Sequence, residues 1–297
     1  MGSLRSSALV AALAFAAGGA AACTGTVVTS DADADTASVH ALLVVEQSTP
    51  VTDDESTRSQ ASVWFLRATD DQAATDATRL VTDVLELPED GACVMMGASS
   101  PPDVAATMTP VELAFAGDVQ VLVGNAATDL AVRAFPDVAG LVSGVVYTVR
   151  RQTALDLASN NQVRVHASGA SEMPSFDATT DAPPPIAGLA INGVAASSPD
   201  AAVLRGQPFY LSWTPSGGDD KVYVDLMAIP GSIEERVRCA VSDTGHLQVP
   251  AMAVPESESV KMTVHRVRDA ALRSDGMETG AAHFDLAVSA RVKVAGR

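Results

Sequence analysis

The sequence predicts an all-β protein of two consecutive antiparallel β-sandwich domains, which follow a signal peptide and a flexible tether. Three observations favour this fold class. Apolar and polar residues alternate in several runs, most clearly from Phe284 to Val294, as is typical of strands with one buried face. Clusters of turn-forming residues separate these runs. A proline-rich break at Asp181–Pro185 then divides the chain into a longer and a shorter part.

Residues 1–22 are expected to be a signal peptide. Arg5 gives a basic start, and the run Ala8–Ala17 is unbroken and apolar. This run is too short for a membrane-spanning helix, which needs about 20 residues. Small residues, Gly18–Ala22, then lead directly into Cys23.

The residues before Cys23 resemble a bacterial lipoprotein signal, in which the cysteine thiol is acylated and becomes the new N-terminus. Ala20 stands where that pattern usually has Leu, and small residues before a cleavage site also suit an ordinary secretory peptidase. Two interpretations therefore remain, a lipid-anchored cell-envelope protein and a freely secreted one. Thr24 follows the cysteine, and the resemblance implies the outer membrane, since Asp at that position retains lipoproteins in the inner membrane.

Residues 23–37 are expected to be an acidic flexible tether. They are polar and show no pattern that could bury one face. Asp31, Asp33 and Asp35 alternate as in a calcium loop, but the Gly and the closing Glu of that motif are missing. We therefore interpret them as solvated.

Residues 38–180 are expected to form a β-rich N-terminal domain. Strands are predicted at His40–Glu46, Ser62–Ala68, Val111–Phe115, Val119–Val123, Leu141–Val149 and Val163–Ala167. The third and fourth of these flank Ala116–Gly117–Asp118, which predicts a hairpin. The segment Asp76–Leu87 fits the face of a helix and the alternation of a strand equally well, so both remain open.

Residues 181–185 are predicted to be a proline linker, and residues 186–297 have the length of one β-sandwich. Phe209–Trp213 and Val222–Ala228 alternate around a turn-rich segment, so we predict a hairpin that sets Trp213 opposite Val222. Val237–Val241 and His246–Val249 flank another turn signal. Burial of Trp213 is expected from its phase in the strand.

The stretch Leu211–Pro215, with Tyr223 on the next strand, is similar to fibronectin type III and other immunoglobulin-like modules. The succession of a lipoprotein signal, an acidic tether, a β-rich half and this module, which also contains Cys239–Gly245, resembles uncharacterised envelope lipoproteins of GC-rich Gram-negative bacteria. The resemblance implies an exported β-sandwich with immunoglobulin-like domains. It implies no activity.

Composition and motifs exclude several function classes. The chain has 36 acidic and 19 basic residues and a formal net charge of −17, which repels the phosphates of nucleic acid. The serine-nucleophile elbow, the His-Glu-x-x-His zinc motif and the phosphate-binding Gly-Lys loop are absent from the sequence. The five histidines lack a metal-binding spacing, and adjacent acids such as Asp219–Asp220 are typical of solvated turns. We predict no catalytic residue, no metal site and no cofactor.

Four residues besides Cys23 are candidates for special roles. Tyr210 and Tyr223 fall on the outward phase of their strands and could form a ligand platform, although two such tyrosines more often reflect cross-strand packing. Cys93 and Cys239 either form a disulfide that joins the two halves or are small buried apolar residues.

These observations favour a non-catalytic envelope lipoprotein with a binding, adhesion or scaffold role. Its expected partners are the membrane, through the lipid anchor, and an envelope protein or glycan. The alternative is an envelope hydrolase or carbohydrate-active protein whose site is assembled from distant loops.

Overall fold

The computed structural model describes residues 38–52, 55–68, 71–81, 87–97, 110–138, 141–151, 155–157, 161–171, 173–231 and 236–296. Strand accounts for 61% of the structure and helix for 6%, which confirms the all-β fold class. The expected signal peptide, the tether and Cys23 lie outside the described residues. In the described ranges, no helix combines the length and the apolar character that crossing a bilayer requires.

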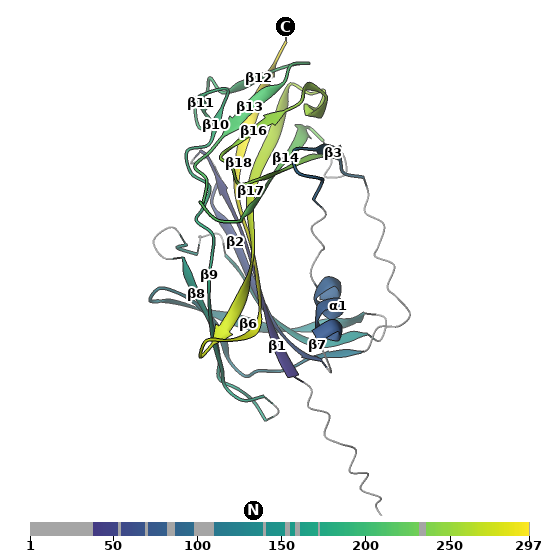
Figure 1. Ribbon diagram of the computed structural model, residues 1–297, viewed down its shortest axis with the longest axis vertical. Coiled ribbons are helices and arrows are strands. Elements are labelled where there is room, and N and C mark those ends of the chain that lie inside the picture. Colours follow the sequence, from purple (N-terminus) through teal and green to yellow (C-terminus); the bar gives the residue numbers. More distant parts are fainter. Residues whose placement is uncertain are drawn as a thin grey trace, which may run out of the picture. The chain divides into compact units, whose positions relative to one another are not determined.

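In the described ranges, strands succeed one another with one α-helix between them (Figure 1). The elements before the proline linker are β1 (Ser38–Pro50), β2 (Arg58–Ala68), α1 (Asp71–Val81), β3 (Cys93–Met95), β4 (Val111–Leu113), β5 (Val119–Val123), β6 (Ala126–Val138), β7 (Val142–Arg151), β8 (Gln162–Ala167) and β9 (Phe176–Asp181). Those after it are β10 (Ala190–Ile191), β11 (Val194–Ala195), β12 (Ala202–Leu204), β13 (Phe209–Ser212), β14 (Lys221–Ile229), β15 (Val237–Ser242), β16 (His246–Val249), the 3-10 helix η2 (Ala251–Ala253), β17 (Ser259–Ser274) and β18 (Met277–Ala295).

Strands from both parts of the chain build one large sheet. It has 14 strands in the order β12-β18-β1-β2-β4-β7-β6-β5-β8-β9-β17-β14-β15-β3, and β17 also pairs with β18 and β2 with β7. The strands from β18 through β1, β2, β7, β6, β5, β8 and β9 to β17 therefore form a closed circuit. Apolar side chains from this circuit, such as Leu43, Phe65 and Tyr147, fill its interior. Most pairs are antiparallel, but β1–β18, β4–β7 and β12–β18 are parallel.

A small sheet of four strands, β11-β10-β13-β16, faces part of the large sheet. A second core lies between them, in which Leu211 and Trp213 pack with Val222 and Val224 of β14. Trp213 is 5% exposed, so its predicted burial is confirmed. Two facing sheets around a shared apolar layer are the architecture of a sandwich.

The predicted hairpin between Phe209–Trp213 and Val222–Ala228 is wrong. β13 pairs with β10 and β16, whereas β14 pairs with β15 and β17 in the large sheet. The turn-rich segment between them carries the chain from one sheet to the other. Both strands point their apolar side chains into the same core, so their alternation agrees with face-to-face packing as well as with edge pairing.

The two other expected turns also connect strands that do not pair with each other. β4 pairs with β2 and β7, while β5 pairs with β6 and β8. β5 forms its hairpin with β6 instead. The two strands are joined by a two-residue turn at Gly124–Asn125, in which Gly124 has a φ of 57°. In the C-terminal part, β15 belongs to the large sheet and β16 to the small one.

The ambiguous segment Asp76–Leu87 is helical as far as Val81, where α1 ends; residues 82–86 lie outside the described ranges. The helix packs Ala73, Ala74 and Ala77 against Leu42 and Trp64 of the large sheet. Tertiary packing of these small residues therefore decides between two local patterns of similar strength.

Strand pairing is continuous across the proline linker. β18, from the C-terminal part, pairs with β1 over ten residues, from Ala41↔Gly280 to Pro50↔Ser289. Figure 1 shows β17 and β18 extending from the neighbourhood of β8 and β9 to that of β13 and β16. The two cores are therefore joined by shared strands as well as by the linker.

Candidate functional site

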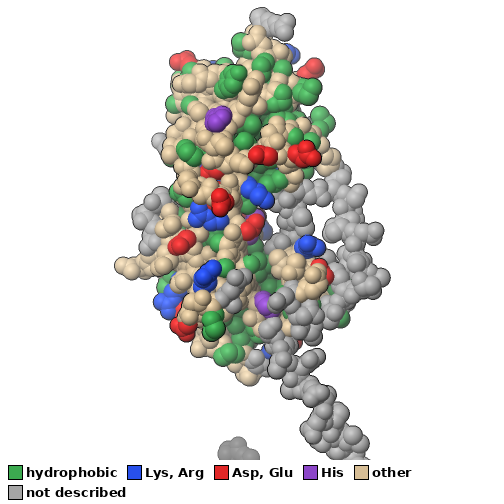
Figure 2. Space-filling model, in the orientation of Figure 1, with side chains coloured by type: hydrophobic (Ala, Val, Ile, Leu, Met, Phe, Trp, Pro, Cys, Tyr) green, Lys and Arg blue, Asp and Glu red, His purple; other side chains and the backbone are tan. Residues whose placement is uncertain are grey.

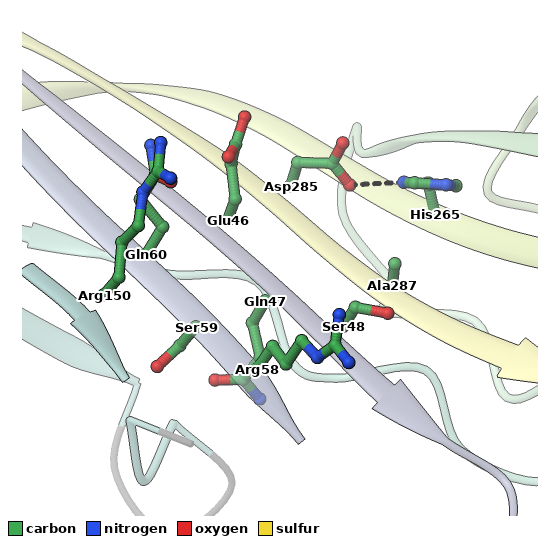
Figure 3. Close-up of a pocket in the computed structure, with 10 residues that line it drawn as sticks. All are labelled: Glu46, Gln47, Ser48, Arg58, Ser59, Gln60, Arg150, His265, Asp285 and Ala287. Carbon is green, nitrogen blue, oxygen red and sulfur yellow. Dashed lines mark hydrogen bonds and ion pairs between the residues drawn. The ribbon is translucent and has the colours of Figure 1, made fainter. Parts of the chain in front are cut away.

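A cleft of about 780 Å³ lies on the large sheet. On the side of β1 that lines the cleft, alternate residues are Leu42 and Val44, which α1 covers, and then Glu46 and Ser48. The lining residues, drawn in Figure 3, are Glu46, Gln47, Ser48, Arg58, Ser59, Gln60, Arg150, His265, Asp285 and Ala287. Charges of both signs lie side by side in the middle of the face that Figure 2 shows.

Strand register explains why these side chains meet. Four adjacent strands contribute one row of cross-strand partners: Asp285, Glu46, Gln60 and Arg150. A second row lies two residues further along: His265, Ala287, Ser48 and Arg58. Residues i and i+2 of a strand share a face, so the two rows form one grid, which we call the polar cleft. Gln47 and Ser59 occupy the intervening positions and are buried.

Asp285 is the most strongly bonded group of the polar cleft. The Tyr223 hydroxyl donates to its Oδ2 at 2.7 Å, and His265 Nδ1 lies 2.7 Å from its Oδ1. Burial by itself would raise the pKa of Asp285, but the hydrogen bond and charge of His265, helped by the Tyr223 hydrogen bond, outweigh burial and lower that pKa. Asp285 therefore stays ionised, with both oxygens occupied.

Tyr223 supports this group from beneath and is not a ligand platform. It is 2% exposed and stacks on His265 with 4.1 Å between ring centroids. The Arg238 guanidinium carbon lies 4.4 Å from the tyrosine ring centroid. Burial, followed by the charge of Asp285, raises the pKa of Tyr223, so the phenol keeps its proton.

The expected pairing of Tyr210 and Tyr223 is therefore corrected. Tyr210 lies in β13 of the small sheet and is 58% exposed, whereas Tyr223 lies in β14 of the large sheet. The outward phase of β14 is covered, because Leu87, Ala240 and Val267 pack around Tyr223. Alternation alone could not reveal that this strand is buried on both faces.

Two arginines give the polar cleft its basic end. Arg58 and Arg150 are exposed, and neither forms an ion pair with another described residue. Figure 3 shows Glu46 between Arg150 and Asp285. In a chain with almost twice as many acids as bases, arginines without an acidic partner are available to an external anion.

Among the described residues of the polar cleft, no nucleophile is hydrogen-bonded to a base. His265 is oriented by a carboxylate, as a general base would be, but in the described contacts no serine or cysteine side chain bonds to its ring. No group of three or more metal-ligating side chains occurs among the described residues. The arrangement is suited to binding polar groups.

Cys93 and Cys239 are joined in the structure by a disulfide with an S–S distance of 2.05 Å and a Cα–Cα distance of 4.0 Å. They are cross-strand partners in β3 and β15. Asp90, shortly before β3, accepts hydrogen bonds from the backbone N–H and the hydroxyl of Ser242 at 2.7 and 2.9 Å. The segment 87–97 is thus attached to the C-terminal core.

No protein-family model matches the chain, and no curated protein matches it in sequence. The fold and the cleft are those of an all-β protein with a polar cleft on a continuous sheet.

The sequence pattern does not group Glu46, Arg58, Arg150, His265 and Asp285. The available signal was weak: Glu46 and Ser48, like Arg58 and Gln60, are polar residues spaced by two on predicted or extended strands. Only the register brings these pairs together.

Stability is expected to fall as the pH rises through the neutral range, because of His283. Its Nδ1 lies 2.7 Å from Asp269 Oδ1, and this hydrogen bond raises the pKa of His283 against the opposing effect of burial. The contribution is complete below the unfolded-state pKa of about 6.5 and is lost as the pH passes the folded-state pKa. The free energy of unfolding, measured from about pH 6 to pH 8, should fall less steeply with pH for His283→Gln than for the wild type. His246→Gln, which removes an exposed histidine, should match the wild type; unchanged behaviour of His283→Gln would contradict this account.

Proposed function

We propose that the chain is a non-catalytic lipoprotein of the bacterial cell envelope, placed in the outer membrane, which binds a polar ligand in the polar cleft. The observation that carries the proposal is the in-register grid of polar side chains, with Arg58 and Arg150 unpaired by described residues. The polar cleft has a volume of about 780 Å³, which is within the usual range for ligand sites. Polar partners such as an envelope glycan or protein suit this surface.

Export is supported by two independent features. The residues before Cys23 resemble a lipoprotein signal, and a Cys93–Cys239 disulfide suits an oxidising compartment. A freely secreted protein is the alternative. We also propose that the two halves derive from immunoglobulin-like sandwiches, for which the facing sheets around Trp213 give support in the C-terminal half.

Cys23→Ala should release the protein from membranes into the soluble fraction. Acylation of this thiol is the proposed attachment, and an acidic surface is repelled by anionic lipid. Membrane fractionation of cells expressing the wild type and the variant, after a carbonate wash, measures the effect. Cys23→Ala that remains in the washed membranes would contradict a lipid anchor at this residue.

A hydrolase is the second candidate, because Glu46 and Asp285 are carboxylates on adjacent strands of one cleft. A glycosidase needs one of its two acids protonated, which requires a raised pKa. Asp285 has a lowered pKa and both oxygens engaged. Asp285 is therefore ionised at neutral pH and would not serve as the acid of such a pair.

The test compares ligand capture by the detergent-solubilised full-length wild type and by Arg58→Gln/Arg150→Gln. Each is incubated with the dialysable and glycan fractions of host envelopes, and retained compounds are identified by mass spectrometry. We expect at least about tenfold less retained material for the cleft variant, since each charge-assisted hydrogen bond stabilises a complex by roughly that factor or more.

The control is Arg79→Gln/Arg133→Gln, which makes the same charge change at exposed arginines outside the cleft. It should retain as much as the wild type. Equal retention by the cleft variant, or none by the wild type, would refute a binding function for this cleft. Ligand released in a cleaved form would favour the hydrolase.

A further inference from the structure

We propose that the polar cleft is one of two subsites in a single groove, and that this groove binds an extended segment of an acidic peptide. The second subsite contains Lys261 and Arg291. This inference rests on the proposed binding function, to which it adds a subsite and a ligand class.

A second pocket, of about 320 Å³, continues the face of the polar cleft along the same strands. On β18, Asp285 and Ala287 line the cleft, and Ser289 and Arg291 line the second pocket. These four residues alternate along one strand and therefore share one face. β1 and β17 also contribute residues to both pockets. The two pockets are therefore consecutive parts of one groove.

The second pocket contains two cations side by side. Lys261 and Arg291 are cross-strand partners in β17 and β18, both are exposed, and neither forms an ion pair with another described residue. Glu55 is the one acid among the described residues that line this pocket. At physiological ionic strength, exposed charges more than about 8 Å apart are largely screened. The acidic net charge of the chain therefore does not prevent an anion from binding here.

The cations of the two subsites are too far apart for a small ligand to contact both. Arg58, Ser48 and Ala287 are partners in one row across β2, β1 and β18, and Arg291 lies four residues further along β18. At about 3.3 Å per residue and 4.8 Å per strand, the Cα atoms of Arg58 and Arg291 are roughly 16 Å apart. A ligand that contacts both subsites is therefore a chain of several units.

Apolar surface accompanies the cations along the groove. Ala287 lies in the cleft, and Pro50, the cross-strand partner of Ser289, lies in the second pocket together with Ile229. The ring of His265 also lines the cleft. A chain that fits this groove therefore carries apolar groups as well as negative charges.

A peptide meets both requirements. Its side chains can be acidic at one position and apolar two residues later, on the same side of an extended backbone. Four or five residues of extended chain span roughly 16 Å, and guanidinium and ammonium groups both bind carboxylates. The hydroxyls of Ser48 and Thr52 can exchange hydrogen bonds with its backbone. Oligouronates and polyphosphates carry a charge on every unit and no apolar side chain, so the apolar part of the groove favours a peptide.

The experiment is calorimetric titration of the detergent-solubilised full-length protein with a blocked seven-residue peptide. The peptide has glutamate at its second and sixth positions, valine at its fourth and threonine elsewhere. We expect it to bind, and its analogue with glutamine for both glutamates to bind at least about tenfold more weakly. An isomer with valine second and glutamate fourth and sixth should also bind at least about tenfold more weakly, because acids two residues apart reach only one subsite.

Two variants test the two subsites separately. Arg58→Gln/Arg150→Gln and Lys261→Gln/Arg291→Gln should each weaken the binding of the first peptide about tenfold or more. All four arginine and lysine side chains are exposed, so both variants should unfold at the same temperature as the wild type, which thermal unfolding measures.

Arg79→Gln/Arg133→Gln makes the same change of charge outside both pockets and should bind the peptide as the wild type does. Absence of peptide binding, equal binding of the glutamine analogue or of the isomer, or unchanged affinity of Lys261→Gln/Arg291→Gln would each overturn the proposal. Tighter binding of trigalacturonate or tripolyphosphate than of the peptide would also overturn it, and would assign the groove to a glycan or phosphate chain. If envelope compounds are still retained through the arginines of the cleft, the proposed binding function stands and only the second subsite and the peptide ligand fail.

Discussion

Removal of the disulfide between Cys93 and Cys239 is expected to lower the free energy of unfolding by about 4–5 kcal/mol. The two cysteines are 146 residues apart in sequence, so the bond closes a long loop in the unfolded chain. In the chain-entropy model, a longer loop gives a larger stabilisation, and the bond is made between strands that are already paired in the folded state.

The variant for this test is Cys93→Ala/Cys239→Ala, since Cys239 is fully buried among apolar residues. Denaturant unfolding of the oxidised wild type and the variant gives the difference. Asp90→Ala is the control, because it removes two exposed hydrogen bonds to Ser242 from the same segment but keeps the disulfide; it should cost only about 0.5–1.5 kcal/mol. A loss under about 1 kcal/mol in the cysteine variant, or labelling of both thiols in unfolded, unreduced protein, would contradict the expectation.

Many strand positions could be predicted from the sequence, but the long strands β6 and β17 were not among them, and strand partners could not be predicted. The alternation of Phe284–Val294 identifies β18, yet nothing within that run indicates that it pairs in parallel with β1, more than 200 residues earlier. Val222 and Leu211 illustrate the same limit, because residues that face each other across a sandwich alternate like residues that pair along an edge.

The polar cleft depends on the same missing information. A polar residue such as Glu46 or Arg58 on a strand indicates only a solvated face. Its chemistry arises when register sets Asp285, Glu46, Gln60 and Arg150 side by side. Tyr223 was misassigned for a related reason, since the chain segment at Leu87 that covers it is distant in sequence.

Trp213→Ala is expected to destabilise the fold by about 3–5 kcal/mol, as is typical of truncating a core aromatic residue. The indole packs in the core between the two sheets, and its removal leaves a cavity there. It also donates from Nε1 to Asp243 Oδ1 at 2.6 Å. Asp243 is held in addition by Arg266 Nη2 at 3.2 Å and by the backbone N–H of Ser216 at 2.8 Å.

Trp213→Phe separates the hydrogen bond from the packing, because phenylalanine keeps much of the apolar volume. Burial alone would raise the pKa of Asp243, but the hydrogen bonds from Trp213, Ser216 and Arg266 outweigh it and lower that pKa. A lowered pKa gives stability that is present above the unfolded-state value of about 3.9 and is lost as the pH falls through the folded-state value. Without the indole donor this pKa is lowered less, so the part of the stability that is lost below about pH 4 should become smaller. Denaturant unfolding should show that Trp213→Phe lowers the free energy of unfolding by about 1–3 kcal/mol at neutral pH. The difference from the wild type should be smaller at acid pH. A loss that is the same at both pH values would mean that Trp213 stabilises this core by packing alone.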